Sequence, residues 1–349
     1  MNPKKTLFDA TETANLTLKN RLFRSATWEG LASGDGTLHE ELYAIYDRLA
    51  AGGVGAIITG GGTVSRWDPG EDGVLRWDDD KWIPAYQRLA DTVHRHDCRI
   101  LAQLNLPRFL KVDPASGESY VAQIAEISEE EIHGIVSDFG AAAARVKAAG
   151  FDGIQIHSAF EWLLNSFLNP QLNHRTDCYG GSEENRCRIH TEILSAIREN
   201  APGLHVTVKF SLFAAPDDLA ARANIITAAR RLSECGIDSI EACINESSVL
   251  NQDMEENDIV IRDVGDLLKF ALAVKAAVNV PVIAVGDLRD IDKMETLLNT
   301  TGIDYLAMSR PLICEPELPN RWKSGDRSPA RCITCNGCYD TVGHKCVFG

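Results

Sequence analysis

The chain has 349 residues, of which 44% are hydrophobic and 24% are charged, and it contains 27 glycines and 13 prolines. At about 150 residues per domain this length fits two domains or one large barrel, and the composition is that of a globular protein rather than a disordered or collagenous one. The formal net charge of −15 opposes the attraction to phosphate that nucleic acids and anionic membranes exploit, so we expect neither as a partner.

No window reaches about 18 uninterrupted apolar residues, and Lys4 and Lys5 near the N-terminus are not followed by an apolar stretch. We therefore expect a cytoplasmic protein without a membrane span. Ten cysteines in that compartment should stay reduced, which predicts metal, redox or core roles rather than disulfides. Four of the ten lie within the last eighteen residues.

Short runs rich in Val, Ile and Leu alternate with longer segments of helical periodicity almost from end to end. Buried parallel strands have this pattern. The sequence predicts eight strands, at Leu22–Thr27, Val54–Gly60, Arg99–Leu104, Gly153–His157, Val206–Phe210, Ser239–Ala242, Val282–Val285 and Tyr305–Met308.

Helical periodicity fills most of the intervals between these strands. The predicted helices are Leu38–Ala51, Asp80–His96, Ser128–Ala149, Glu184–Glu199, Asp217–Cys235, Asp263–Ala277 and Asp290–Asn299. In the third of them, Ser128 and Glu131 have the spacing of a capping box, and Gly150 ends the helix.

Strand and helix alternate often enough to close a (β/α)8 TIM barrel, an α/β fold of about 250 residues plus insertions. A doubly wound open sheet is the alternative. We expect Thr6–Leu18 to form a hairpin over the amino-terminal end of the barrel, and Ser158–Arg188 to be a long insertion after the fourth strand. The expected domains are the barrel at residues 1–325 and a cysteine-rich tail at 326–349.

The chemistry of such barrels lies where the strands end. After the first strand come the small residues Ser25, Ala26 and Thr27, and Gly61 follows the second, so a flat ligand can approach the backbone. Gln103, at the end of the third strand, offers one acceptor and two donors to an imide-like ring edge. Ordinary packing at a crowded barrel rim explains each of these patterns equally well when it is taken alone.

Two ionisable side chains occupy the next strands. His157 ends the fourth, where a neutral imidazole can donate a hydrogen bond to a carbonyl oxygen. Lys209 interrupts the buried fifth strand and needs a negative partner, either an internal carboxylate or an electron-rich cofactor. A phosphate site is predicted after the seventh and eighth strands, where barrels use backbone N–H groups and a guanidinium. Its residues are Gly286, Asp287, Ser309 and Arg310.

A pattern of four segments runs through nearly the whole chain: KNR at 19–21, AGFDGIQIH at 149–157, LLNSFLNP at 163–170 and NHRTDCYGGSEENR at 173–186. This pattern resembles the old yellow enzyme family of FMN-dependent oxidoreductases, and the last segment is its most specific part.

The resemblance implies FMN at the carboxyl ends of the strands, reduced by NADH or NADPH. It places the family's cofactor roles on residues singled out above: Ser25, Ala26, Thr27, Gly61, Gln103 and Lys209 for the flavin, and Gly286, Asp287, Ser309 and Arg310 for its phosphate. Hydride would pass from flavin N5 to the β-carbon of an activated alkene, and His157 would hydrogen-bond the substrate carbonyl as its charge develops.

The family pattern breaks just after His157. Phe160 and Trp162 replace the usual second carbonyl donor and the tyrosine that protonates the α-carbon. Solvent or another side chain then supplies the proton, the substrate is not an ordinary enone, or alkenes are not reduced. With Trp28, these two aromatic residues are expected to line a site for a bulky, hydrophobic small-molecule substrate.

The tail contains a C-x2-C-x2-C-x7-C pattern made of Cys332, Cys335, Cys338 and Cys346. Four thiolates so spaced can hold an iron–sulfur cluster or zinc. The run resembles the cluster-binding stretch of longer family members, 2,4-dienoyl-CoA reductase and trimethylamine dehydrogenase, although its last gap is shorter. A [4Fe–4S] cluster, a zinc ion and no metal all stay open.

The sequence therefore favours an FMN-dependent ene reductase that uses NADH or NADPH on an α,β-unsaturated carbonyl compound. Two alternatives are an amine (C–N) oxidoreductase on the same flavin and an electron-transfer protein whose substrate site has degenerated. Whether the chain forms a homo-oligomer stays open as well.

Overall fold

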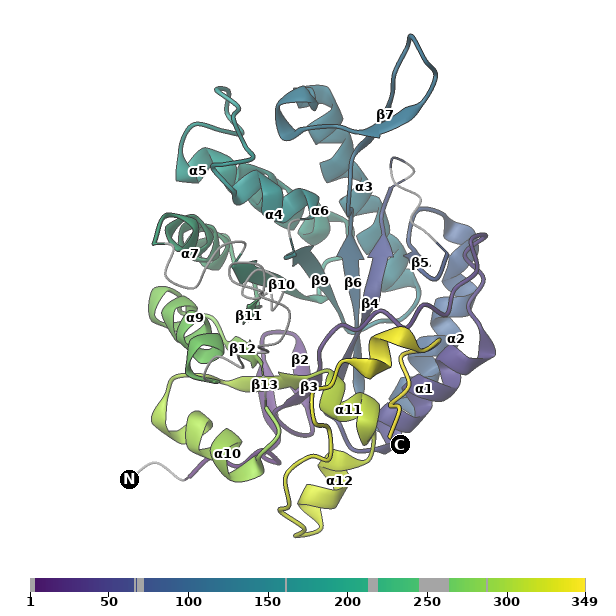
Figure 1. Ribbon diagram of the computed structural model, residues 1–349, viewed down its shortest axis with the longest axis vertical. Coiled ribbons are helices and arrows are strands. Elements are labelled where there is room, and N and C mark those ends of the chain that lie inside the picture. Colours follow the sequence, from purple (N-terminus) through teal and green to yellow (C-terminus); the bar gives the residue numbers. More distant parts are fainter. Residues whose placement is uncertain are drawn as a thin grey trace, which may run out of the picture.

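A closed ring of parallel strands organises the computed structural model, which describes residues 4–65, 67, 72–160, 162–212, 219–244, 264–286 and 288–348 (Figure 1). The eight strands of the ring are, in chain order, β3 (Leu22–Arg24), β4 (Ala56–Thr63), β6 (Arg99–Asn105), β9 (Gly153–Ser158), β10 (His205–Leu212), β11 (Ser239–Ile244), β12 (Val282–Val285) and β13 (Tyr305–Met308). Neighbours in the chain are neighbours in the ring, and β3 closes it by pairing with both β13 and β4. This closure excludes the open sheet and confirms the (β/α)8 barrel.

Helices surround the ring (Figure 1). They are α1 (Glu40–Ala51), α2 (Ile83–His94), α3 (Glu129–Ala148), α4 (Leu163–Leu168), α5 (Glu183–Arg186), α6 (Arg188–Asn200), α7 (Leu219–Glu234), α9 (Val264–Ala277), α10 (Ile291–Thr300), α11 (Arg310–Cys314) and α12 (Leu318–Lys323). Three short 3-10 helices are η1 (Asp80–Trp82), η2 (Ile124–Glu126) and η3 (Gly337–Asp340). The predicted capping box of α3 is present, because Ser128 accepts from the Glu131 N–H and the Glu131 carboxylate accepts from the Ser128 N–H.

The structure corrects several predicted boundaries, including the helix predicted at Asp80–His96, which is η1 followed by α2 and ends at His94. Strand β3 ends at Arg24 instead of Thr27, and beyond it the hydroxyl of Thr27 bonds the hydroxyl of Ser309 at 2.8 Å. The helix predicted from Glu184 is two helices, α5 and α6, with the junction at Cys187. Residues 217, 218 and 263, predicted to begin two other helices, lie outside the described residues.

One short parallel strand and two antiparallel hairpins complete the fold. Strand β5 (Leu75–Arg76) extends the sheet beside β4, and β7 (Leu110–Val112) pairs with β8 (Ser119–Val121) in a hairpin that projects from the barrel in Figure 1. The expected N-terminal hairpin is β1 (Thr11–Thr13) paired with β2 (Leu16–Leu18).

The hairpin β1–β2 closes the amino-terminal end of the barrel. Leu16 and Leu18 are buried in one apolar cluster with inward-facing strand residues such as Phe23, Leu101 and Tyr305. Ile57 and Ile100, which alternate with these inward positions, belong instead to the larger core between the strands and the helices. An apolar layer therefore fills one end of the barrel and leaves the carboxyl end for polar side chains.

Candidate active site

The second layer of the barrel interior is a chain of polar side chains. The Gln103 amide donates to Gln155 at 2.8 Å, and the Gln155 amide donates to the Glu241 carboxylate at 3.1 Å. All three residues are at most 3% exposed. They come from β6, β9 and β11, whose inward positions alternate with buried apolar residues, so the strand period itself points them to the barrel axis.

Glu241 is the anionic partner that the lysine of the fifth strand requires. The Lys209 ammonium lies 3.0 Å from a Glu241 carboxylate oxygen and donates to the Ser25 hydroxyl at 3.1 Å. Ser25 in turn donates to the same carboxylate at 2.8 Å. Although burial opposes the charged form, the Glu241 carboxylate outweighs it and holds the pKa of Lys209 above its usual range. The lysine therefore stays cationic at the base of the site.

The edge of the site formed by β4 and β6 has the close backbone approach that a flat ring needs. A Cβ on Gly61 would lie 3.2 Å from the Gln103 side-chain oxygen, and one on Gly60 would lie 2.7 Å from the Thr27 carbonyl oxygen. The buried Asn105 side-chain oxygen on the same strand as Gln103 has no hydrogen-bond partner. A flavin ring fits this edge of the site, because the two glycines leave the backbone uncovered. The amide groups and the buried cation can bind the polar atoms of the ring.

His157 lies beside Lys209 in the strand register and is 4% exposed. Burial and the nearby Lys209 cation lower the pKa of His157 to about 3, so the ring is neutral at physiological pH. Its Nδ1 atom is buried without a partner. Trp162 stacks on the imidazole with ring centroids 4.7 Å apart and an interplanar angle of 18°.

Phe160 lies in a backbone conformation that side chains rarely adopt, with a φ of 61°. Its N–H donates to the Ser211 hydroxyl at 2.9 Å, and its ring centroid lies 5.7 Å from that of His157 and 5.6 Å from the Lys209 nitrogen. The structure therefore brings Phe160 and Trp162 together at His157. Trp28 is 50% exposed, and its indole N–H donates to the Gly73 carbonyl.

The predicted phosphate residues lie at neighbouring strand ends. Gly286 follows β12, and Ser309 and Arg310 follow β13. The Ser309 hydroxyl bonds Thr27, which ties the phosphate end to the loop after β3. Asp287 lies outside the described residues. Ala26 is partly buried against the apolar layer below.

A buried acid that sequence reasoning missed lies behind this loop. Glu29 is 6% exposed, 3.6 Å from the Arg24 guanidinium and 3.5 Å from the Tyr46 hydroxyl. Burial raises the pKa of Glu29 to about 7 and lowers that of Arg24, so both shifts weaken the charged pair. The sequence signal was available, since Arg24 interrupts an apolar strand as Lys209 does.

The four tail cysteines line one cavity of about 270 Å³ between the tail and α11. Cys314 of α11, which the sequence analysis did not select, lines it too and is hydrogen-bonded to Cys346. All five thiols are free of disulfides. Across the described ranges, no three or more His, Cys, Asp or Glu side chains are arranged to hold a metal ion.

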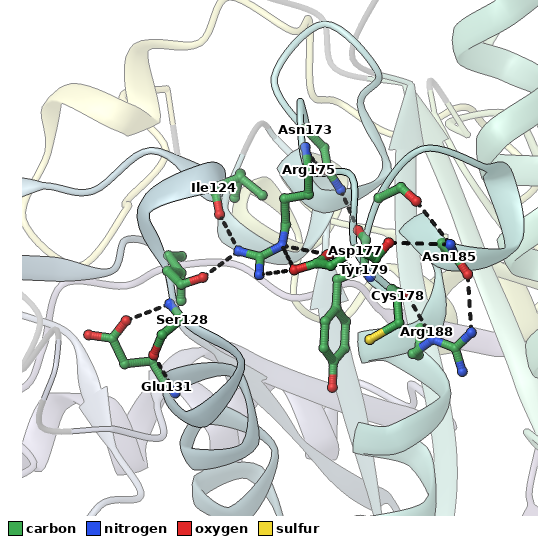
Figure 2. Close-up of polar contacts among 12 residues, drawn as sticks. Ile124, Ser128, Glu131, Asn173, Arg175, Asp177, Cys178, Tyr179, Asn185 and Arg188 are labelled. Atoms are coloured by element: carbon green, nitrogen blue, oxygen red, sulfur yellow. Dashed lines mark hydrogen bonds and ion pairs between the residues drawn. The ribbon is translucent and has the colours of Figure 1, made fainter.

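The most specific sequence segment has a structural role. Figure 2 shows that Arg175 reaches from the loop after α4 to the carbonyl oxygen of Ile124 and pairs with Asp177. Arg175 also donates to the carbonyl oxygen of Ile127, just before α3. Within the same loop, the Asn185 amide donates to the Gly180 carbonyl at 3.0 Å. These contacts fasten the insertion after β9 to the segment before α3.

Comparison with known proteins supports the assignment made from the residues. The profile of the NADH:flavin oxidoreductase / NADH oxidase family matches residues 6–328. An NADH oxidase from Thermoanaerobacter brockii is 33% identical over 95% of this chain and 53% of its own length. An NADPH dehydrogenase from Clostridium acetobutylicum is 30% identical over 89% of this chain and 92% of its own. Morphinone reductase has the same fold, with a TM-score of 0.74 at 23% identity over 93% of this chain and 90% of its own.

This barrel with its lysine, glutamine and glycine edge is thus of the flavin-binding class. The chain belongs to the NADH:flavin oxidoreductase / NADH oxidase family, whose members are oxidoreductases that use FMN and a reduced nicotinamide. The chain spans about half the length of the first curated relatives that it matches. In the part of the chain that the structure describes, no helix has both the length and the apolar composition to cross a bilayer.

Proposed function

We propose that this protein uses FMN and NADH or NADPH to reduce the C=C bond of an α,β-unsaturated carbonyl compound. The observation that carries the proposal is His157, a buried neutral imidazole with an unpaired ring nitrogen next to a buried cation. A buried polar atom without a partner is costly, and a ligand that supplies one regains that cost. The bound FMN supplies hydride transfer between the nicotinamide and the substrate.

The chain's own residues bind and orient the two reactants. Gln103 and Lys209 hold the pyrimidine edge of the flavin, and the Lys209 cation stabilises negative charge there. His157 hydrogen-bonds the substrate carbonyl, while its stacking on Trp162 fixes the plane of the imidazole. Preorganised donors of this kind act where charge develops in the transition state.

The side chains expected to contact the substrate beside His157 are aromatic and do not include a proton donor for the α-carbon. Phe160 is 37% exposed beside His157, and the indole N–H of Trp162 can donate a hydrogen bond but is too weakly acidic to serve as a general acid. We infer that the proton for the α-carbon comes from water, and that the aromatic surface selects an apolar substrate. The experiments below also distinguish alkene reduction from the two alternatives, amine oxidation and a degenerate substrate site.

The first test is the absorption spectrum of the protein purified without oxygen, followed by rapid mixing with NADH and then cyclohexenone. Flavin bands that bleach with NADH and return with the enone are expected. Return with oxygen but with no enone would reject alkene reduction, and bleaching by an amine would favour the C–N alternative. Failure to take up added FMN would overturn the whole proposal.

The second test addresses His157 directly. We expect His157→Ala to retain FMN but to bind a phenol, a mimic of the enolate, at least tenfold more weakly, because a buried hydrogen bond to a charged oxygen is lost. Since the pKa of His157 is held near 3, the affinity of the wild type should show no step from this residue between pH 5 and pH 8. His174→Ala is the control, because His174 is an exposed histidine on the adjacent loop. Equal affinities of wild type and His157→Ala would remove His157 from this role.

We further propose that Cys332, Cys335, Cys338 and Cys346 hold a [4Fe–4S] cluster, with zinc as the alternative. Two observations support a metal site: the four cysteines line one cavity, and thiolates are suitable ligands for iron and zinc. Among the described residues, the sulfur atoms are not arranged around one point that a metal ion could occupy. Elemental analysis should find about four iron atoms per chain for the cluster. Replacing the four cysteines with serine should abolish the metal, whereas Cys178→Ser and Cys235→Ser, at exposed sites elsewhere, should not. Unchanged metal content after the fourfold replacement would refute the site.

The cytoplasm is the compartment we propose for this protein. The chain has ten cysteines in 349 residues, and five of them line one cavity. A reducing compartment such as the cytoplasm maintains cysteines as thiols.

A further inference from the structure

Two arginines at the phosphate end of the barrel are both bonded to the cysteine-bearing tail. Arg289 follows β12 by four residues, and its guanidinium donates to the Cys332 carbonyl at 3.1 Å. Arg310 follows β13, and its guanidinium donates to the side-chain oxygen of Asn336 at 2.6 Å. A backbone bond from the Ala330 N–H to the Arg289 carbonyl, at 2.8 Å, fastens the same stretch of tail. Residues 330–336 thus span the two strand ends between which the phosphate site is proposed.

Asn336 occupies a left-handed backbone position in the tail. Asn336 has a φ of 60° and caps the amino end of η3, between Cys335 and Cys338. Asparagine and glycine adopt this left-handed conformation more readily than other residues. The side chain of Asn336 is short and starts from this turn, and its bond to Arg310 fixes the position of the amide.

We propose that the tail is the positioning element of the cofactor-phosphate site, with Asn336 acting through Arg310. This inference rests on the proposed FMN site. A guanidinium has five N–H donors in one plane, so a bond to Asn336 through one of them orients the plane for the phosphate. Holding the long side chain in place before binding removes an ordering cost from cofactor association. Asn336 is a neutral amide, so this contact orients Arg310 without itself neutralising the guanidinium charge.

The sharpest variant is Asn336→Gly, because glycine accepts the left-handed backbone and only the amide is lost. Thr334→Gly is the matched control: Thr334 lies in the same tail with a φ of 57°, and its hydroxyl bonds only the adjacent Ile333 carbonyl. Flavin-fluorescence titrations would measure the affinity of the flavin-free full chain for FMN and for riboflavin, which lacks the phosphate.

We expect Asn336→Gly to weaken FMN binding about tenfold, the effect of one charge-assisted hydrogen bond, and to leave riboflavin binding unchanged. Thr334→Gly should bind both flavins like the wild type. Asn336→Asp should weaken FMN binding further, because a carboxylate beside Arg310 competes with the phosphate.

Three results would count against the inference. FMN affinity in Asn336→Gly within twofold of the wild type would show that Asn336 does not position Arg310. Equal losses for FMN and riboflavin would show a general effect on the flavin site. A wild-type chain that binds neither flavin would overturn the proposed function itself, and this inference with it.

Discussion

The charge of Lys209 is balanced inside the barrel by Glu241, which makes this buried carboxylate essential to the site. Glu241 is fully buried and accepts hydrogen bonds from Ser25 and Gln155 as well as pairing with Lys209. Removing one partner of such a pair leaves an uncompensated buried charge, whereas removing both does not.

We therefore expect Glu241→Gln to lower the free energy of unfolding by about 3 kcal/mol or more, and Lys209→Met added to it to restore most of the loss. Urea denaturation of the four proteins of the double-mutant cycle measures this. Glu40→Gln, which breaks an exposed pair with Arg88, should change stability little. Additive effects of the two substitutions would contradict the coupling.

Glu29 makes stability depend on pH near neutrality. Its carboxyl ionises near pH 4.5 in the unfolded chain but holds its proton to about pH 7 in the folded one. Between these values the folded state binds more protons, so this contribution to stability is greatest below pH 4.5 and declines until about pH 7.

The wild type should therefore lose up to about 3 kcal/mol relative to Glu29→Gln between pH 5 and pH 8. Thermal melts across that pH range measure the stability of both proteins. Subtracting one stability profile from the other removes the contributions of the titrating groups that the two proteins share. Parallel profiles would mean that the Glu29 carboxylate is well solvated or well paired when folded.

At the level of elements, the insertion after β9 is held by one arginine. Arg175 bonds two carbonyl oxygens before α3 and Asp177 in its own loop, and it is 9% exposed. A lysine cannot reproduce that planar set of donors. We expect Arg175→Lys to lower the melting temperature by a few degrees and to expose the loop to limited proteolysis. Arg88→Lys, at the exposed pair with Glu40, is the control, and equal behaviour of the two variants would disprove the fastening role.

The elements were largely predictable because barrel strands are buried on both faces and read as continuous apolar runs. The same logic identified Lys209 as an interruption, and applied to Ser239–Ala242 it would have found Glu241 as well. The pairing of Arg310 with Asn336 was not predictable, since it joins residues 26 positions apart through side-chain geometry alone. The loop from Asn173 was recognised as a signature, but its fastening role appears only in three dimensions.

At the scale of the whole molecule, cofactor binding and folding are linked. A ligand that binds only the folded state at about 100 times its dissociation constant adds about 2.7 kcal/mol of stability. For a chain of 349 residues that corresponds to a melting temperature about 4 °C higher. We expect this shift with FMN in calorimetry and a smaller one with an equal concentration of riboflavin. No shift with FMN would contradict the proposed flavin site.

In the part of the chain that the structure describes, the hairpin β1–β2 covers the amino-terminal end of the barrel, so we expect ligands to enter at the carboxyl end. Leu16 and Leu18 seal one end with apolar side chains, so reductant and oxidant must approach the same face of the cofactor from the same side. They cannot occupy that space together. Steady-state kinetics should therefore follow a ping-pong scheme, in which each reactant competes with the other for one vestibule and excess of either inhibits turnover.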